Sequence, residues 1–290
     1  MRFTKWHGLG NDFVLLDGFD EKVVMTPSLA RQLCDRKRGI GADGVAIILP
    51  PEDSHYDLEM RIYNADGTIA EMCGNVTRCV AAYATQKQPD KRQWRILTAA
   101  GVMSADVIAY TTKTSEATVM MGIPELQRGD IGITEDKEQL AQNIRIDMDG
   151  ETLIFTGVSM GNPHVVTFVD DIDAVPLGDW GPRVESNPLF SEKTNVEFAQ
   201  VLSSNEIRMR VWERGVGITE ACGTGSCATL VAAVINKLVR NTATLILDGG
   251  RLQITWSGVG QPVQMTGPAV KVFNGEYKGI GENDDEYTIN

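Results

Sequence analysis

The chain contains 290 residues, with a net charge of −12 and a sequence pI near 4.8. Such an acidic surface repels nucleic-acid phosphates and anionic lipids, so nucleic acid and membranes are excluded as expected partners. Apolar runs such as 45–49 are too short to span a bilayer, and the N-terminal residues do not form an apolar signal segment. We therefore expect a cytoplasmic protein, in which the five cysteines stay reduced.

Short segments of alternating polarity dominate the chain. Residues 56–63 place Leu58, Met60 and Ile62 on one face and charged residues on the other, which is the period of a half-buried strand. Thr26-Pro27 opens a helix, because a capping hydroxyl precedes a proline at the first helical position. The other expected strands are, in chain order, 13–16, 117–121, 165–169, 207–212, 244–247, 252–256 and 270–273. Two alanine-rich helices are expected at 79–86 and 228–238. This pattern predicts an α+β chain with many antiparallel strands and few helices.

The two alanine-rich helices indicate an internal repeat. Each follows a Cys-Gly pair, at Cys73 or Cys222, with a glutamate two residues before the cysteine and another cysteine five or six residues after it. We interpret the match as two domains of similar build, each with one cysteine at a helix N-terminus; chance is the alternative. The acidic residues 278–290 have little to bury and are expected to form a disordered tail.

A cysteine at a helix start lies where unpaired N–H groups and the helix dipole favour its thiolate. The N–H groups of Gly74, Asn75, Gly223 and Thr224 can hold a substrate carboxylate. Two such sites facing each other would place one sulfur on each side of the adjacent carbon. One thiolate could then remove a proton while the opposite thiol returns one, which inverts the carbon without a metal or an organic cofactor.

Packing is the alternative role for each cysteine, since most free cysteines are small buried hydrophobes. We assign Cys34, Cys79 and Cys227 to packing, whereas the matched helix starts favour chemistry at Cys73 and Cys222. A zinc site is disfavoured because the three histidines and the cysteines do not form a cluster with ligand spacing.

Two polar clusters belong to other parts of the sequence. Asn162 and His164 lie in a turn before an apolar run, and Glu213-Arg214-Gly215 ends a predicted strand. If their charges are buried, they should be paired or functional. The alternatives are a solvated histidine and a surface ion pair between Glu213 and Arg214.

These segments together resemble the diaminopimelate epimerase family over residues 1–277. Six motifs carry the resemblance in the family's order: KWHGLGNDF at 5–13, NADG at 64–67, MCGN at 72–75, GNPH at 161–164, ERGVG at 213–217 and ACGTG at 221–225. The resemblance implies cofactor-independent interconversion of L,L- and meso-diaminopimelate in lysine and peptidoglycan precursor biosynthesis. It also implies a small amino-acid substrate, no metal, and a homodimer.

The fold implied by the resemblance has two pseudo-symmetric domains, each a curved, mostly antiparallel sheet around a central helix, with the site between them. The expected domains are residues 1–118 with 268–277, and residues 119–267. By position, Cys73 and Cys222 are the paired acid and base, with His164 and Glu213 beside the thiols. The residues implied to bind substrate are Asn11, Asn64, Gly74, Asn75, Asn162, Asn195, Glu213, Arg214, Gly223 and Thr224. Among these, Arg214 suits the distal carboxylate through its bidentate fork.

Three positions depart from the family pattern. Val76 replaces the glycine usual after Cys-Gly-Asn, and Ile69 and Ile218 stand where acidic residues are common. These β-branched side chains near the cysteines bear on substrate range and turnover. Two alternatives follow: a racemase or epimerase of another amino acid, such as histidine or hydroxyproline, and a catalytically impaired binding protein. The polar residues assigned to the distal end argue against the first, because a smaller substrate would leave them unpaired.

Overall fold

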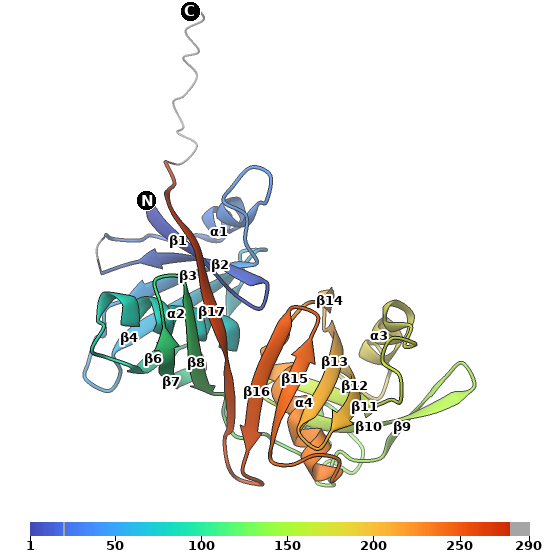
Figure 1. Cartoon of the computed structure of the whole chain (residues 1–290). Coiled ribbons are helices and arrows are strands. Elements are labelled where there is room, and N and C mark those ends of the chain that lie inside the picture. Colours follow the sequence, from blue (N-terminus) through green and yellow to red (C-terminus); the bar gives the residue numbers. More distant parts are fainter. Residues whose placement is uncertain (20, 279–290) are drawn as a thin grey trace, which may run out of the picture.

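The computed structural model describes residues 1–19 and 21–278, so the predicted acidic tail, apart from Lys278, lies outside the described residues. Within them, seventeen strands are linked by pairing into two lobes, each built around an α-helix (Figure 1). The expected α+β fold of two similar domains is confirmed. No helix in these residues is both long and apolar enough to cross a membrane.

We call the first half of this arrangement the N-lobe. Its strands are β1 (Arg2–Gly8), β2 (Asn11–Asp17), β3 (Gly44–Leu49), β4 (Leu58–Asn64), β5 (Ile69–Ala70), β6 (Gln93–Thr98), β7 (Gly101–Tyr110) and β8 (Thr114–Met120). Its helices are α1 (Pro27–Cys34) and α2 (Gly74–Lys87).

The second half is the C-lobe. Its strands are β9 (Ile144–Met148), β10 (Glu151–Ser159), β11 (Pro163–Phe168), β12 (Asn195–Ser203), β13 (Glu206–Glu213), β14 (Gly217–Thr219), β15 (Thr242–Leu247) and β16 (Gly250–Trp256). Its helices are the short 3₁₀ helix η1 (Gly129–Ile131), α3 (Leu177–Glu185) and α4 (Gly223–Ile235).

The two lobes repeat one order of strand pairing. In the N-lobe, β2 is antiparallel to β1 and parallel to β3, β3 and β4 are antiparallel, and β6 runs parallel to β4 after the hairpin to β5 and the helix α2. In the C-lobe, β11 has the same relation to β10 and β12, and β13, β14, α4 and β15 follow in the same order. The repeat found around the two Cys-Gly pairs is thus a repeat of the whole fold, while the residue boundaries of the domains stay a prediction.

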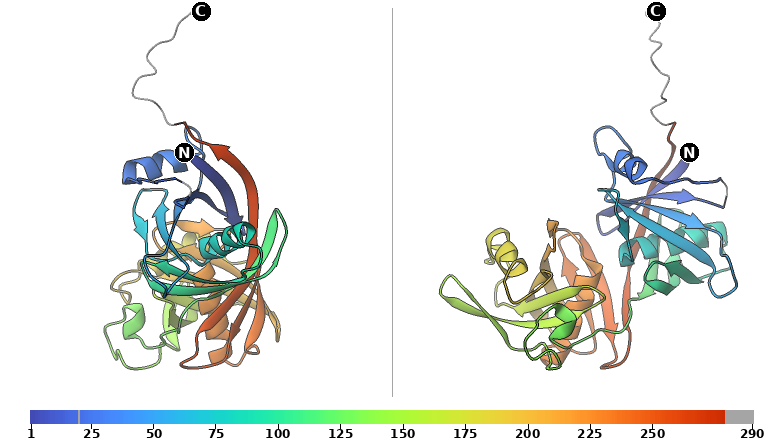
Figure 2. Two further views of the ribbon diagram at one scale, coloured as in Figure 1. Left: turned by 90° about the vertical axis from the view of Figure 1, so that its left-hand side faces the viewer. Right: turned by 180° about the vertical axis from the view of Figure 1, so that it is seen from behind.

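One strand, β17 (Val263–Glu276), runs through both lobes (Figures 1 and 2). It pairs antiparallel with β16 in the C-lobe, then with β8 and finally with β1 in the N-lobe. At its end, Met1 and Tyr277 exchange two backbone hydrogen bonds, of 2.8 and 3.1 Å. The end of the described chain therefore completes the sheet that its beginning starts.

The main apolar core surrounds α2 and α4 and is continuous between the lobes. The helices α1 and α3 lie over separate, smaller cores. Each strand expected from the sequence overlaps an observed strand, and Thr26 caps α1 as expected, with its hydroxyl accepting from the Leu29 N–H at 3.2 Å. The expected starts of the two alanine-rich helices were wrong: α2 and α4 each begin five residues earlier, and α4 ends at Ile235 rather than at residue 238.

Candidate active site

The two Cys-Gly pairs lie at the N-termini of the two central helices. Cys73 is the residue immediately before α2 and Cys222 the one immediately before α4, and both have extended backbone. The helix starts meet at Met265 of β17: a Cβ added to Gly74 would lie 2.5 Å from Met265 Cε, and one added to Gly223 would lie 3.4 Å from the same atom. A side chain at position 74 would displace the methionine side chain, so glycine allows the close approach there. The two helix starts therefore lie against the same methionine.

Cys222 is buried and faces negative charge. Its Sγ accepts the Gly225 N–H at 3.3 Å and contacts Thr224 Oγ1 at 3.6 Å. Burial raises the pKa of the thiol well above its ordinary value, and the carboxylates of Glu213 and Glu197 raise it further. The contacts from Thr224 and Gly225 lower the pKa but do not offset these effects. Burial and the two carboxylates therefore both favour the thiol form of Cys222.

Glu213 ends β13, as expected, and is half-buried beside Cys222. Burial raises the pKa of its carboxyl group, while hydrogen bonds from Thr219 and Cys222 lower it. The described contacts do not include an ion pair between Glu213 and Arg214, so the simple surface pair is excluded. Arg214 instead donates its Nη1–H to the Glu192 carbonyl at 3.1 Å, and its backbone N–H to Asn195 Oδ1 at 2.9 Å.

His164 is fully buried, so a solvated histidine is excluded. Its Nδ1 lies 2.7 Å from Oε1 of the equally buried Glu197, and its Nε2 lies 3.0 Å from Asn162 Oδ1. An imidazolium beside a carboxylate satisfies both contacts, as does a neutral ring beside a protonated Glu197. A Cβ on Gly225 would lie 2.6 Å from Glu197 Oε1, so this pair reaches the first turn of α4.

Cys73 has different neighbours. It is half-buried, and its Sγ donates to Asn11 Oδ1 at 3.8 Å, the oxygen that also accepts from Asn75 Nδ2 at 3.1 Å. Burial raises the pKa of this thiol, whereas the N–H groups of Val76 and Asn75 and the charge of Arg78 lower it. Cys73 thus lies beside a cation as well as at a helix N-terminus.

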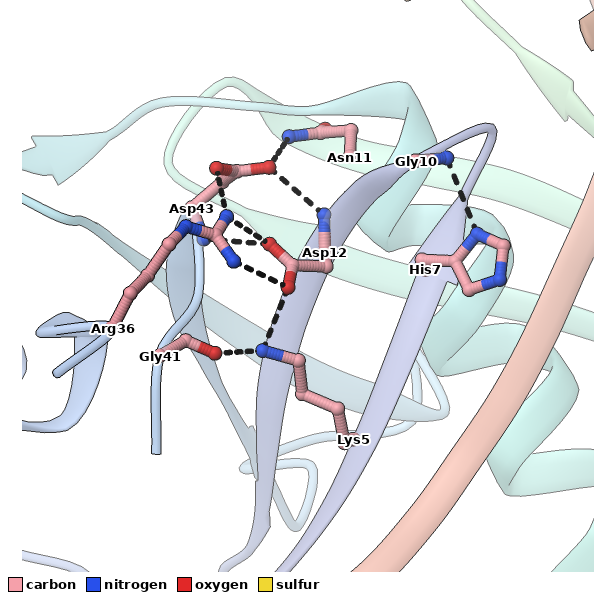
Figure 3. A network of polar contacts seen from close by, with 8 residues as sticks. All are labelled: Lys5, His7, Gly10, Asn11, Asp12, Arg36, Gly41 and Asp43. Atoms are coloured by element: carbon pink, nitrogen blue, oxygen red, sulfur yellow. Dashed lines mark hydrogen bonds and ion pairs between the residues drawn. The ribbon is translucent and has the colours of Figure 1, made fainter. Parts of the chain in front are cut away.

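A network of charged groups holds Asn11 in place (Figure 3). Asn11 donates its Nδ2–H to Asp43 Oδ2 at 3.0 Å, and Arg36 joins Asp43 to Asp12 with bonds of 2.7 and 2.8 Å. The buried Lys5 pairs with Asp12 at 2.8 Å. Because Asp43 takes the amide nitrogen of Asn11, the amide oxygen faces Cys73.

The other site residues expected from the sequence divide into two groups. Asn195 lies near His164, because its Nδ2–H donates to the carbonyl of the preceding residue, Pro163, at 2.8 Å. Asn64 lies at the end of β4, where its side chain donates to Thr68 Oγ1 at 2.9 Å. The described contacts do not link it to either cysteine, so its role in binding stays a prediction. Ile69 and Ile218 are exposed, each four residues before its cysteine.

The remaining cysteines are buried in the cores. Burial raises the pKa of Cys34 to about 11, and that of Cys79 and Cys227 to about 12. Such thiols are inert at neutral pH, which agrees with a packing role. In residues 1–19 and 21–278, no group of three His, Cys, Asp or Glu side chains gathers to hold a metal ion.

Several residues that form this site were missed in the sequence. Glu197 lies in the buried run 195–199, where alternation gives no sign of a charged partner. Asp43 and Arg36 reach Asn11 through contacts that only the fold creates. Arg78 lies in the turn of α2 that the late expected helix start excluded.

A two-lobed fold with a sheet curved around one central helix in each lobe is the diaminopimelate epimerase-like fold. The diaminopimelate epimerase family matches residues 3–127 and 156–272. The chain belongs to the diaminopimelate epimerase family.

Individual relatives agree with this assignment. The chain is 46% identical to a diaminopimelate epimerase from Halothermothrix orenii, over 95% of this chain and 97% of the relative. It is 47% identical to diaminopimelate epimerase 1 from Nostoc sp., over 95% and 99%. A solved hydroxyproline epimerase from Agrobacterium vitis, 16% identical, shares the fold with a TM-score of 0.67, over 95% and 91% of the two chains.

Proposed function

We propose that the protein interconverts L,L- and meso-diaminopimelate, with Cys73 and Cys222 as the paired base and acid. The observation that carries the proposal is the meeting of two thiol-bearing helix N-termini at Met265, in a chain of this family. Diaminopimelate has two amino-acid ends, and inversion at one of them links the two isomers.

The reaction needs only proton transfers. The thiolate of one cysteine removes the α-proton, its S–H bond forms, and the electron pair of the C–H bond spreads onto the carboxylate. The thiol of the other cysteine then gives its proton to the opposite face of the carbon, which leaves the second sulfur as thiolate. Glu213 contacts Cys222, and His164 acts through Glu197, whose charge reaches the same thiol. The reverse reaction exchanges the roles of the two cysteines.

The helix N-termini suit the developing negative charge. The N–H groups of Gly74, Asn75, Gly223 and Thr224 belong to first turns that lack intrahelical acceptors, so we assign the reacting carboxylate to them. Asn11 contacts the Cys73 thiol, and Asn162 contacts His164 in the other lobe. We assign the distal end of the substrate to Asn64, Asn195 and Arg214, with the guanidinium of Arg214 on the distal carboxylate. No organic cofactor or metal is part of this proposal.

Proton exchange tests the proposal directly. In D2O, under reducing conditions, the protein should introduce deuterium at the reacting α-carbon of L,L-diaminopimelate without added cofactor. Cys73→Ser and Cys222→Ser should each stop inversion, whereas Cys34→Ser, at the buried last residue of α1, should retain it. Inversion that survives both active-site changes would rule out the two-thiol mechanism.

The alternatives give different exchange results. Faster exchange with hydroxyproline, histidine or another monocarboxylate than with diaminopimelate would indicate a different amino-acid racemase. Binding of diaminopimelate without exchange would indicate a protein that has lost catalysis. The buried Val76 and the exposed Ile69 and Ile218 are the positions to revert in that case.

We further propose a cytoplasmic homodimer. A reducing compartment keeps opposed thiols free, and all five cysteines are free in the structure. On β17, Val272 and Phe273 leave 53% and 46% of their surface exposed, which supports a contact between copies at this strand. Light scattering should give the mass of a dimer, and Phe273→Asp should shift it to a monomer. A monomeric parent protein would contradict the proposal.

A further inference from the structure

Arg78 is a fully buried arginine without an acidic partner. It lies in the second turn of α2 and donates to Asn75 Oδ1 at 2.8 Å, to the Pro268 carbonyl at 3.2 Å and to the Gly74 carbonyl at 3.5 Å. Its remaining contact is with Met265 Sδ at 3.5 Å. All these acceptors are neutral, and arginine stays charged in a protein interior. Within residues 1–19 and 21–278, its charge therefore has no carboxylate to balance it.

Glycines of two neighbouring strands leave space for this guanidinium. A Cβ on Gly8 of β1 would lie 2.8 Å from Arg78 Nη2, and one on Gly267 of β17 would lie 3.4 Å from Arg78 Nε. Two strands thus leave out side chains where the guanidinium lies. Burying an unpaired charge costs free energy. Because the fold nevertheless leaves space for this guanidinium, we expect an anion to form or bind beside it.

Few groups near Arg78 can become that anion. The thiols that its charge reaches are Cys73 and Cys79 of α2 and Cys227 of α4. Burial raises the pKa of Cys79 and Cys227 to about 12, so both stay neutral. The other charged group facing Cys73 is Glu213 of β13, which opposes thiolate formation there. Two candidates for the anion remain: the Cys73 thiolate and a ligand bound at the start of α2.

We propose that Arg78 is a positioning residue whose buried charge is balanced by the anion that forms at the start of α2, the Cys73 thiolate or the substrate carboxylate. It acts through Asn75, whose amide oxygen it holds so that the amide nitrogen donates to Asn11 Oδ1, the oxygen that also contacts the Cys73 thiol. The part of this inference that concerns the substrate rests on the proposed function, whereas the part that concerns the thiolate does not.

Alkylation of the thiols tests the inference without any substrate. Arg78→Met keeps a long side chain and removes the charge, and Arg78→Lys keeps the charge without the fork. The rate of reaction of Cys73 with iodoacetamide, followed by peptide mass spectrometry from pH 6 to 10, reports its thiolate fraction. We expect about a tenfold slower reaction in Arg78→Met at neutral pH, and a rate close to that of the parent in Arg78→Lys. An unchanged profile for Cys73 in folded Arg78→Met would overturn the inference.

A second variant decides the matter if Arg78→Met fails to fold. Asn75→Asp would place a permanent carboxylate beside Arg78, and Thr224→Asp, at the equivalent second position of α4, is the matched control without an arginine. We expect Asn75→Asp to raise the melting temperature and to slow alkylation of Cys73, and Thr224→Asp to lack this stabilisation. Equal effects of both variants on melting temperature, with unchanged alkylation of Cys73, would contradict the inference. Failure of diaminopimelate exchange in the parent protein would contradict only the proposed function.

Discussion

The two active-site thiols differ in the charges around them. Cys222 faces Glu213 and Glu197, and Cys73 faces the buried Arg78. Burial raises the pKa of both thiols, but the neighbouring carboxylates favour the protonated form of Cys222, and the arginine favours the thiolate of Cys73. In the proposed reaction the two sulfurs share one proton, and these charges favour its position on Cys222 before substrate binds.

Removing the carboxylate of Glu213 should release Cys222 from part of this bias. Since the carboxylate raises the pKa of the thiol, Glu213→Gln should lower that pKa and speed alkylation of Cys222 at neutral pH by up to about tenfold. Inversion should nevertheless slow, because the carboxyl group borders the reacting thiol. Iodoacetamide kinetics with peptide mapping measure the first effect. Glu206→Gln, at the opposite end of the same strand, is the control, and equal rates in both variants would contradict the prediction.

At the scale of elements, the first turns of α2 and α4 supply most of the groups assigned to the site. The expected starts of these helices were too late because glycine, asparagine and threonine have low helix propensity, and the alanine-rich segments alone gave the signal. The first turn of a helix lacks intrahelical acceptors for its N–H groups, so residues suited to binding, rather than helix formers, occupy it. The repeat of Cys-Gly pairs, in contrast, predicted that a cysteine lies at the N-terminus of each helix and that the two lobes are alike.

Long-range contacts explain what the sequence left out. His164 and Asn162 were found through a turn motif, but Glu197 comes from a strand buried on both faces, whose pattern hides a charged residue. Arg78 was missed for a similar reason, since its partners Pro268 and Met265 are almost 190 residues away. Local patterns predict elements and caps, whereas these pairings depend on how the sheet curves around each helix.

Gly225 in the first turn of α4 provides a test at this scale. A Cβ there would lie 2.6 Å from Glu197 Oε1 and 3.2 Å from Cys222 Sγ. Gly225→Ala should therefore destabilise the fold by about 1–3 kcal/mol and lower the inversion rate by about a hundredfold. Gly178→Ala in α3, where nothing lies within 4 Å of the new methyl group, should stabilise by roughly 0.5–1 kcal/mol. Thermal unfolding and exchange rates check both, and similar behaviour of the two variants would refute the argument.

The hairpin of β1 and β2 carries a pH-dependent contribution to stability. Burial alone would raise the pKa of Asp12, but the hydrogen bonds from Arg36 and Lys5 lower it from 3.8 to about 2. A carboxyl group with a lowered pKa in the folded state stabilises the protein above its unfolded-state value and loses this contribution as the pH falls toward the folded-state value. Parent stability should thus decline between about pH 4 and pH 2.

Asp12→Asn should be less stable than the parent at pH 7 and should show a flatter decline over that acid range. Urea unfolding at a series of pH values measures both effects. Asp106→Asn, on the exposed side of β7, should leave the curve unchanged. An identical acid dependence for the parent and Asp12→Asn would disprove this role for the network in Figure 3.

At the scale of the whole molecule, the lobes share a strand and a core. The strand β17 pairs with β16 on one side and with β8 and β1 on the other, and the main apolar core contains both α2 and α4. Unfolding of either lobe would therefore expose a strand edge and apolar core surface of the other. The resemblance to a known family predicted the two domains, but the sequence patterns alone did not show that one strand serves both.

We therefore expect a single cooperative unfolding transition. Differential scanning calorimetry should give one peak, with a calorimetric enthalpy close to the van't Hoff enthalpy. Two separable peaks would mean that the shared strand and core do not couple the lobes.

The position of β17 has a consequence for how the protein is made. The ribosome releases β1 first, yet its partner residues in β17 lie some 270 positions later, between 270 and 276. Throughout synthesis the edges of β1 and β8 stay without that partner, while β9 to β16 can pair as they emerge. The second-made half of the enzyme can thus fold before the first-made half is finished. A nascent chain halted just before β17 would carry three open sheet edges, at β1, β8 and β16, a state prone to aggregation and dependent on chaperones.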